Sequence, residues 1–363
     1  MKKHLKWMLA LLMLLVVSSL SAQHASNRDS VFQQRQDSLI RLRRAMLQAD
    51  EQFVRFNLNE KLIDYWMETL RMEGAERFAF NAIDSMYLVQ SPDRKLRIVT
   101  WHLLNDDFTY DYFGIAQTYS ARHKTYVVFE LKDKADRLPH PEYEMLRNGD
   151  WFGAIYFDII QVQKSKNFLQ DIFGTGRTYY TLLGWNGNDF KTDIKLIDVA
   201  YLQSNGDIVM GYPLFRTQDH RLRRIIFEYA DRYPMTMNYD KQYQIIEEDN
   251  GRSRSRYRRQ PPPPDVSNRS DDFRAQQGEK KPKEKQPKAE PKKMIIFERL
   301  IPRRPELEGI PSQTVPHPED FAAFIFENGR WTYYNNVDAL NPPDKSDNYE
   351  RTYDSKSLFK QKQ

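Results

Sequence analysis

The sequence predicts an α+β protein that is mainly β, in which N-terminal helices are followed by about fourteen short antiparallel strands. We expect the strands to form a sandwich, an open barrel or a propeller-like stack. Two sequence patterns predict this fold. Apolar residues recur at helical spacing before residue 84, and short runs of β-branched and aromatic residues follow at intervals of about ten residues. A third observation is the basic, proline-rich insertion at 251–293, whose composition predicts disorder.

Residues 1–22 have the order of a secretory signal peptide. Lys2, Lys3 and Lys6 form a positive start, 8–17 is an unbroken apolar stretch, and small residues lead to Ala22. The apolar stretch is about half of the ~20 residues needed to span a bilayer. We therefore expect cleavage near Ala22 and a periplasmic or otherwise exported protein, with no transmembrane segment after cleavage.

The chain contains no cysteine. This excludes disulfides, a thiol nucleophile, a thiolate metal site and a lipid-modified cysteine after the signal peptide, so we do not expect a lipoprotein. An exported domain without disulfides depends on its hydrophobic core. A chain of 363 residues, 40% hydrophobic and 13% aromatic, can bury one large core or two modest ones.

Residues 23–84 are predicted to be an N-terminal helical segment. From Asp29 to about Ile83 the helical spacing is kept by Val31, Phe32, Leu39, Leu42, Met46 and Leu47. A second helix is predicted from Asn59 to Met72, with Gly74 as its stop. Its apolar face consists of Leu62, Ile63, Trp66 and Leu70. The helices are expected to pack against the strands or to form a small cap, because the apolar repeat is too short for a coiled coil.

The first part of the β-rich domain is predicted at 85–250. SMYLVQSPDRKLRIVTWHL indicates a hairpin with a Pro-Asp turn, and Ile98 and Trp101 are expected on opposite faces of its second strand. A second hairpin is predicted around Ser120–Lys124, and one small helical insertion around Pro141–Arg147. Further strands are predicted at WFGAIYFDIIQVQ, RTYYTLLGW, DIKLIDVAYL, DIVMGYPLF and RRIIFEYA.

The last strands lie on both sides of the insertion. MTMNYDKQYQIIEED is predicted to be a short hairpin with a turn near Asp240-Lys241. The second part of the β-rich domain, 294–340, contains MIIFERLIP and a hairpin whose Asn328-Gly329 is the strongest short turn signal. Residues 341–363 are expected to form a flexible tail. The insertion is therefore predicted to interrupt one domain rather than to join two.

The basic charge of the chain is concentrated in one segment. Gly251–Lys293 contains seven Arg and seven Lys against six acidic residues, a net charge of +8. The signal peptide adds +3 and the whole chain carries +5, so the rest carries −6. No nucleic-acid partner is expected, because such a partner needs basic residues on a folded surface, interleaved with stacking aromatic residues.

Two roles stay open for this segment. It is expected to be a solvated spacer, because closing a loop costs only about 0.6 kcal/mol more for each doubling of its length. The alternative is weak electrostatic contact with anionic envelope polymers, such as lipopolysaccharide or peptidoglycan, or with a partner protein.

The sequence shows no catalytic or metal-binding motif. It lacks His-Glu-x-x-His and Gly-x-Ser-x-Gly, and its histidines have no ligand spacing. Gly174–Arg177 is interpreted as a turn rather than a phosphate loop. Asn105, Asp107, Thr109 and Asp111 alternate like calcium ligands but lack the Gly and Glu of such a loop, so they are interpreted as surface groups. No cofactor, metal or catalytic residue is predicted.

The candidate binding residues are Trp185, Asn188 and Asp189 in the run TYYTLLGWNGND. Trp185 could be a stacking platform for a sugar ring, with hydrogen bonds supplied by the two polar side chains. The alternative is packing of Trp185 at the core, as expected for large aromatic residues near strand ends.

Several of these runs resemble an uncharacterised group of exported proteins of Bacteroidota. The similar runs, which span most of Ser85–Val337, are SPDRKLRIVTWHL, RTYYTLLGWNGND, KLIDVAYL, RRIIFEYA, MIIFERLIP and FAAFIFENGRWTYYNNV. The resemblance implies a periplasmic or outer-envelope β-rich protein, and it implies no activity and no site residues. The insertion is longer than the link expected in similar sequences.

Two functions remain open. A non-enzymatic envelope protein that binds, scaffolds or assembles is favoured, with another envelope protein or a glycan as partner, because no catalytic constellation is assembled. The alternative is a hydrolase that acts on envelope or dietary polymers through carboxylates that the sequence does not identify. Acidic or histidine side chains converging in a deep pocket would favour the hydrolase, whereas exposed aromatic residues would favour binding.

Overall fold

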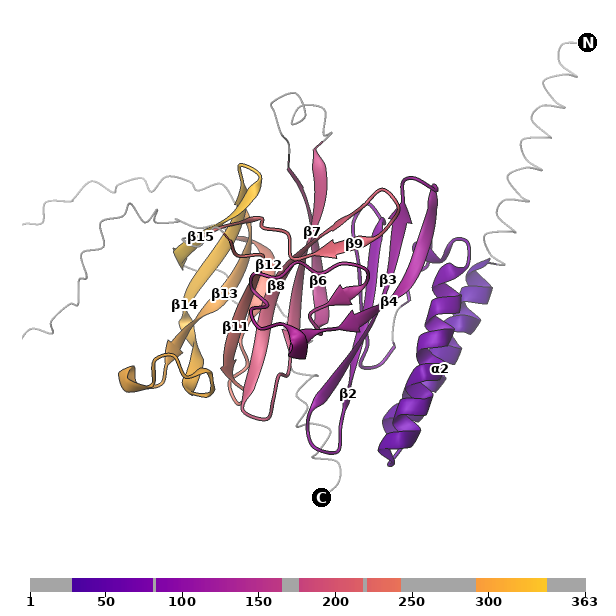
Figure 1. The fold of residues 1–363 in the computed structure, drawn as a ribbon, viewed down its shortest axis with the longest axis horizontal. Coiled ribbons are helices and arrows are strands. Elements are labelled where there is room, and N and C mark those ends of the chain that lie inside the picture. Colours follow the sequence, from indigo (N-terminus) through magenta and orange to yellow (C-terminus); the bar gives the residue numbers. More distant parts are fainter. Residues whose placement is uncertain (1–27, 81–82, 165–175, 218–220, 243–291, 338–363) are drawn as a thin grey trace, which may run out of the picture.

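The protein is built from four layers that lie side by side, a helical layer followed by three β-sheets (Figure 1). This computed structural model describes residues 28–80, 83–164, 176–217, 221–242 and 292–337. Each pair of neighbouring layers encloses its own cluster of buried apolar side chains. The predicted class, α+β and mainly β with N-terminal helices, is confirmed, and the strands form stacked open sheets.

The helical layer consists of a helix over 28–48, α2 (Gln52–Arg71) and the 3-10 turn η1 (Ala75–Arg77). The expected stop is confirmed, because Gly74 adopts a φ of +89° just beyond α2. The expected start at Asn59 is wrong, since α2 begins at Gln52. Asn59 lies buried inside the helix, where its Oδ1 accepts a hydrogen bond of 2.7 Å from Nε1 of Trp101.

The first sheet has the order β1-β2-β3-β4-β5. Its strands are β1 (Tyr87–Gln90), β2 (Leu96–Leu104), β3 (Tyr110–Ser120), β4 (Thr125–Asp133) and β5 (Asp150–Trp151). Both predicted hairpins are confirmed by the antiparallel pairs β1–β2 and β3–β4. The expected alternation is also confirmed, because Ile98 faces the second sheet while Val99 and Trp101 face the helices.

The helical insertion predicted around Pro141–Arg147 is wrong. A 3-10 turn, η2 (Ala135–Arg137), precedes these residues, which themselves form a turn and a β-bridge. Leu146 bridges to Met210, and the backbone carbonyl of Glu142 accepts hydrogen bonds from the backbone of Arg223 and Arg224. Pairing with distant strands uses backbone groups that a helix would need for itself.

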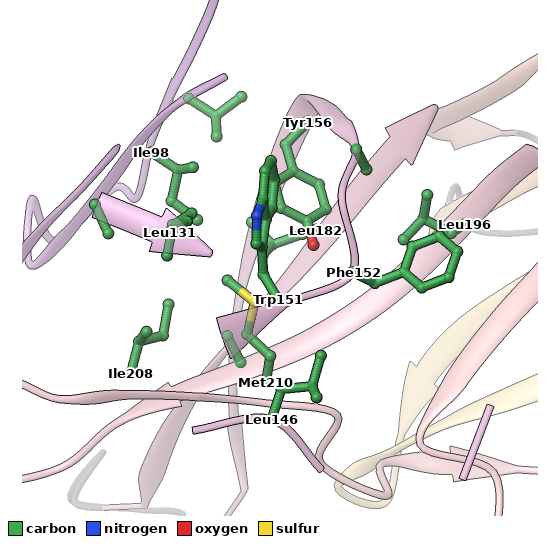
Figure 2. Close-up of a cluster of buried hydrophobic side chains, with 14 of the residues drawn as sticks. Ile98, Leu131, Leu146, Trp151, Phe152, Tyr156, Leu182, Leu196, Ile208 and Met210 are labelled. Carbon is green, nitrogen blue, oxygen red and sulfur yellow. The ribbon is translucent and has the colours of Figure 1, made fainter. Parts of the chain in front are cut away.

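The second sheet is the central layer and has the order β11-β8-β7-β6, with β9 paired to β8. Its strands are β6 (Ile155–Lys164), β7 (Arg177–Asn186), β8 (Thr192–Leu202), β9 (Ile208–Met210) and β11 (Arg224–Ala230). Figure 2 shows Trp151 at the centre of the core between the first two sheets, with Tyr156 and Leu182 beside it.

The third sheet combines strands from both sides of the predicted insertion. Its order is β10-β15-β14-β13-β12, formed by β10 (Phe215–Arg216), β12 (Met237–Gln242), β13 (Lys292–Pro302), β14 (Thr314–Glu327) and β15 (Arg330–Val337). The short 3-10 turns η3 (Pro305–Leu307) and η4 (Pro311–Gln313) connect β13 to β14. The predicted Asn328-Gly329 turn is confirmed, with φ of 50° and 72°.

The hairpin predicted with a turn at Asp240-Lys241 is wrong. These residues lie inside β12, whose partner is β13, and Gln242 is the register partner of Lys292. The strand before the insertion thus pairs with the strand after it. The local pattern of turn residues was overridden by a partner about 50 residues further along the chain.

Buried polar side chains link the layers. Arg97 of β2 donates to the backbone carbonyls of Ala75 at 2.6 Å and of Phe78 at 3.0 Å, and Gln117 donates to that of Leu70 at 2.8 Å. Burial lowers the pKa of Arg97 to about 10, so its guanidinium stays charged at neutral pH. These bonds hold the helical layer to the first sheet.

Several predicted segments lie outside the described residues. They are the signal peptide (1–22), almost all of the basic segment (251–293) and the tail (341–363). Within the described ranges, no helix has the length and apolar character needed to cross a bilayer.

Candidate functional site

The predicted binding residues lie at the end of β7 and in the turn that follows it. Trp185 is partly buried, and its ring lies 6.0 Å from that of Tyr110 and 5.9 Å from that of His102. Asn188 and Asp189 are exposed in the β7–β8 turn. The structure thus places the three residues at one end of the sheets.

The two polar residues hold the turn together. Oδ1 of Asp189 accepts hydrogen bonds from the backbone N–H groups of Lys191 at 2.7 Å and Thr192 at 2.8 Å. Nδ2 of Asn188 donates to Oγ1 of Thr192 at 2.7 Å. The two side chains thus stabilise the turn itself. This role explains why polar residues follow Trp185, and it requires no bound ligand.

Trp185 belongs to an aromatic cluster with His102, Tyr110 and Tyr112. The hydroxyl of Tyr112 accepts a hydrogen bond of 2.6 Å from the backbone N–H of Gly187. A Cβ at Gly187 would lie 2.7 Å from the ring of Tyr110, so only glycine allows the turn to approach this closely. This cluster was not predicted from the sequence; the signal for it is the aromatic residues on both sides of the β2–β3 turn.

His102 is the titratable group at the centre of this cluster. Desolvation, with a smaller contribution from the charge of Arg43, lowers its pKa to about 3. Its Nδ1 is buried and has no hydrogen-bond partner among the described residues. The imidazole is therefore neutral at physiological pH and acts as a third aromatic ring beside Tyr110 and Trp185.

We expect His102 to make the stability of the protein depend on pH. Its folded pKa lies below the unfolded value of about 6.5, so below pH 6.5 the unfolded state binds a proton that the folded state excludes. His102 therefore lowers the free energy of unfolding increasingly as pH falls from about 6.5 towards 3, with a slope of at most about 1.4 kcal/mol per pH unit. Urea unfolding between pH 7.5 and 4.5 should show a shallower pH dependence in His102→Phe. Equal slopes in the two proteins would contradict this expectation.

Beside the cluster, three segments form an edge that we call the loop rim: 50–54, 105–109 and 187–191. Each segment exposes a phenylalanine, with exposed fractions of 73% for Phe53, 58% for Phe108 and 71% for Phe190. Exposure of three large aromatic side chains at one end of a protein is characteristic of an interaction surface.

Specific contacts hold the loop rim in place. Gln52 donates to Oδ1 of Asn105 at 3.3 Å, and the guanidinium of Arg55 contacts the carboxylate of Asp106. These contacts join the start of α2 to the β2–β3 turn. The Tyr110–Trp185 and Tyr112–Gly187 contacts then join that turn to the β7–β8 turn. The three segments consequently belong to one continuous edge at the lower end of Figure 1.

Phe108 has a backbone conformation that disfavours its own side chain. Its φ is +66°, in the left-handed region where glycine and asparagine are preferred. For other residues this region costs about 1 kcal/mol or more. With 58% of its surface exposed, the side chain adds little to the core.

The loop rim is acidic. Its three segments contain five carboxylates, and Lys191 is the only basic residue within them. Those carboxylates belong to Asp50, Glu51, Asp106, Asp107 and Asp189. Hydrogen bonds from the side chain and backbone of Thr109 lower the pKa of Asp107, so this carboxylate is ionised at neutral pH.

Other features of the described residues are weaker candidates for a binding site. Asn105, Asp107, Thr109 and Asp111 bond mainly to one another around the β2–β3 turn, as in the 2.7 Å bond from Thr109 to Asp107. Within the described ranges, no three His, Asp or Glu side chains are grouped to hold a metal ion. A shallow depression on the helical layer is lined by Arg35, whose guanidinium pairs with Glu68 at 3.3 Å.

Comparison of the chain with protein-family models, with curated proteins and with solved structures finds no match. The candidate site therefore depends on geometry and chemistry alone.

Proposed function

We propose that the protein is an exported envelope protein that acts by binding or assembly and that the loop rim is its contact surface. The observation that carries the proposal is the exposure of Phe53, Phe108 and Phe190 on three adjoining segments. The partner class is another envelope protein or a glycan. Export and an origin among the Bacteroidota proteins described above belong to the same proposal, supported by the order of residues 1–22 and by the sequence resemblance.

The energetics of the loop rim support binding. A phenylalanine that becomes buried on contact contributes about 1.5–3 kcal/mol, so three such residues can dominate an interface. The hydrogen bonds of the rim order its turns before a partner arrives, which lowers the entropic cost of association. The positive φ of Phe108 also fits a contact surface, because backbone strain is often retained at functional sites.

The carboxylates of the rim also fit binding better than hydrolysis. Asp107 and Asp189 accept hydrogen bonds from their own turns, and Asp106 contacts Arg55. They lie on an open edge, where water would keep their charges solvated. A general acid or base is usually enclosed and shifted in pKa by its surroundings.

We expect substitution of the rim phenylalanines to abolish partner contact without unfolding the protein. A photo-crosslinking residue at position 190 should give discrete adducts in native envelopes, to be identified as protein or glycan by mass spectrometry. Adding Phe53→Ser and Phe108→Gly should reduce these adducts at least tenfold, because two hydrophobic contacts are lost.

The matched control places the crosslinker at position 310, since Ile310 is 44% exposed and lies outside the rim. The control also combines a crosslinker at 190 with Tyr333→Ser, which removes an exposed ring from another sheet. Phe108→Gly should leave stability unchanged or slightly higher, because glycine tolerates the positive φ. Adducts that resist the rim substitutions, or arise equally at 310, would refute the proposal.

A further inference from the structure

The loop rim and the basic segment 251–293 carry opposite charge. The three segments of the rim contain five carboxylates and one lysine, whereas Gly251–Lys293 contains fourteen cations and six acidic residues. Guanidinium groups also bind the faces of aromatic rings, so an Arg-rich chain suits both the carboxylates and the phenylalanines of the rim. Lys191 shows such a contact on a small scale, since its Nζ lies 5.1 Å from the ring of Phe190.

The basic segment is attached at the end of the fold opposite to the rim. The segment lies between β12, which ends at Gln242, and β13, whose first residue, Lys292, is the register partner of Gln242. That end of the third sheet also holds the Asn328-Gly329 turn, because Met294 pairs with Ile325.

The second sheet connects this end to the rim. A Cβ at Gly329 would lie 3.0 Å from the side chain of Lys164, which pairs with Arg177 at the start of β7. β7 then runs its ten residues to Asn186, beside the rim. Ten residues of strand span about 33 Å. In Figure 1, the start of α2 and the junction of β12 with β13 accordingly lie towards opposite ends.

We propose that the loop rim binds the basic segment 251–293 of a second copy of this chain, so that copies associate head to tail. The inference rests on the proposed function, because it names the partner of the same surface. Two complementary surfaces at opposite ends of a molecule make a heterologous contact, which generates chains or rings rather than a closed two-fold dimer. The attraction comes from opposite net charges, +8 on the basic segment and −6 on the chain outside this segment and the signal peptide.

The attraction is expected to depend strongly on salt. Exposed charges are screened over about 10 Å at 0.1 M ionic strength and over about 3 Å at 1 M. Sedimentation velocity of the mature chain should therefore show concentration-dependent association at 50 mM salt that is lost at 500 mM. A monomer at both salt concentrations, at protein concentrations up to 100 μM, would overturn the inference.

Two variants separate contact between copies from contact within one copy. The first keeps the segment and carries Asp106→Asn, Asp107→Asn and Asp189→Asn, in which asparagine retains the Oδ1 acceptors of the turns. The second keeps the rim and replaces 251–291 with a short Gly-Ser link. Each should be monomeric alone, and an equimolar mixture should form a one-to-one complex. Failure of the mixture to associate would overturn the inference, and so would self-association of either variant.

A charge-matched control carries Asp136→Asn, Glu306→Gln and Glu308→Gln, all exposed and outside the rim. It should associate like the unchanged chain, and loss of association in this variant would reduce the effect to net charge alone and overturn the inference. A labelled 251–293 peptide should bind the link variant at least tenfold more tightly than a link variant with the neutralised rim. If these tests fail while crosslinks from position 190 to another envelope component persist, the proposed function stands and only the self-association falls.

Discussion

Replacing Asp198 by alanine is expected to destabilise the protein by about 3–5 kcal/mol, because it leaves the charge of Arg224 buried without its partner. Both side chains are fully buried, and Nη2 of Arg224 lies 2.7 Å from Oδ2 of Asp198. Nε of Arg224 also donates to the same oxygen at 2.9 Å. The remaining donor, Nη1, reaches the backbone carbonyl of Pro141 at 2.6 Å and cannot replace the lost anion.

The large effect expected at Asp198 also reflects its other partners. Its carboxylate accepts hydrogen bonds from the backbone N–H of Gly211 at 3.1 Å and from the hydroxyl of Tyr156 at 3.4 Å. Asp198 therefore connects β8 with β11, β6 and the segment after β9. Its removal leaves several buried donors without an acceptor, and each such donor costs about 1–3 kcal/mol.

Urea unfolding of Asp198→Ala measures this loss directly. The double variant Asp198→Leu/Arg224→Met should recover part of the stability, since an apolar pair needs no compensation for desolvation. The control is the half-exposed pair Arg299–Asp320, 2.9 Å apart, in which Asp320→Ala should cost about 0–1 kcal/mol. A cost below 1 kcal/mol for Asp198→Ala would contradict the assigned role of the buried pair.

The sequence predicts features that depend on neighbouring residues. The alternation of Ile98 with Val99 and the Asn328-Gly329 turn follow from the two-residue period of a strand and from the positive φ that such turns require. Both are therefore visible in a short stretch of sequence, and both are confirmed.

Predictions from the sequence are wrong where a residue distant in the chain determines the local structure. Asn59 resembles a helix start, but its side chain bonds to Trp101, 42 residues away. Asp240-Lys241 resembles a turn, but β13 pairs with it across the insertion. Local propensity carries no information about either partner.

The candidate site was predicted only in part for the same reason. Trp185 lies beside the loop rim and Asn188 and Asp189 lie within it, yet the side chains of these two polar residues bond within the β7–β8 turn. The exposure of Phe53 and Phe108 depends on how α2 and two hairpins meet. Phenylalanine in a sequence predicts burial as a rule, so its position on an exposed edge requires the fold.

A chain that ends at Asn250 is expected to lose cooperative folding and to aggregate. It lacks β13, β14 and β15, and with them Phe297, Phe324 and Trp331, which are buried against the second sheet. The indole of Trp331 also donates to Oγ1 of Thr181 in β7 at 2.8 Å. Burial of three aromatic side chains contributes several kcal/mol, which is comparable with the roughly 5–15 kcal/mol stability of a whole domain.

The truncation also exposes β12 and the apolar face of the second sheet. The side chains of Phe215, Met235 and Met237 are at most 1% exposed in the intact fold. After truncation they would face water or another chain. Unpaired strands with an apolar face are prone to pair between molecules, so residues 23–250 should elute as aggregates and show no cooperative thermal transition.

The decisive comparison keeps both halves and shortens only the connection between them. Because Gln242 and Lys292 are adjacent register partners, a short Gly-Ser link in place of 251–291 can join the two strands without strain. This variant should retain a cooperative transition, with a free energy of unfolding within about 1 kcal/mol of the unchanged chain, since shorter loops close at lower entropic cost. A soluble 23–250 fragment that unfolds cooperatively would instead mean that the third sheet is dispensable. In that case the cluster around Trp331 would add stability to a fold already complete without it, and the insertion would join two independent units.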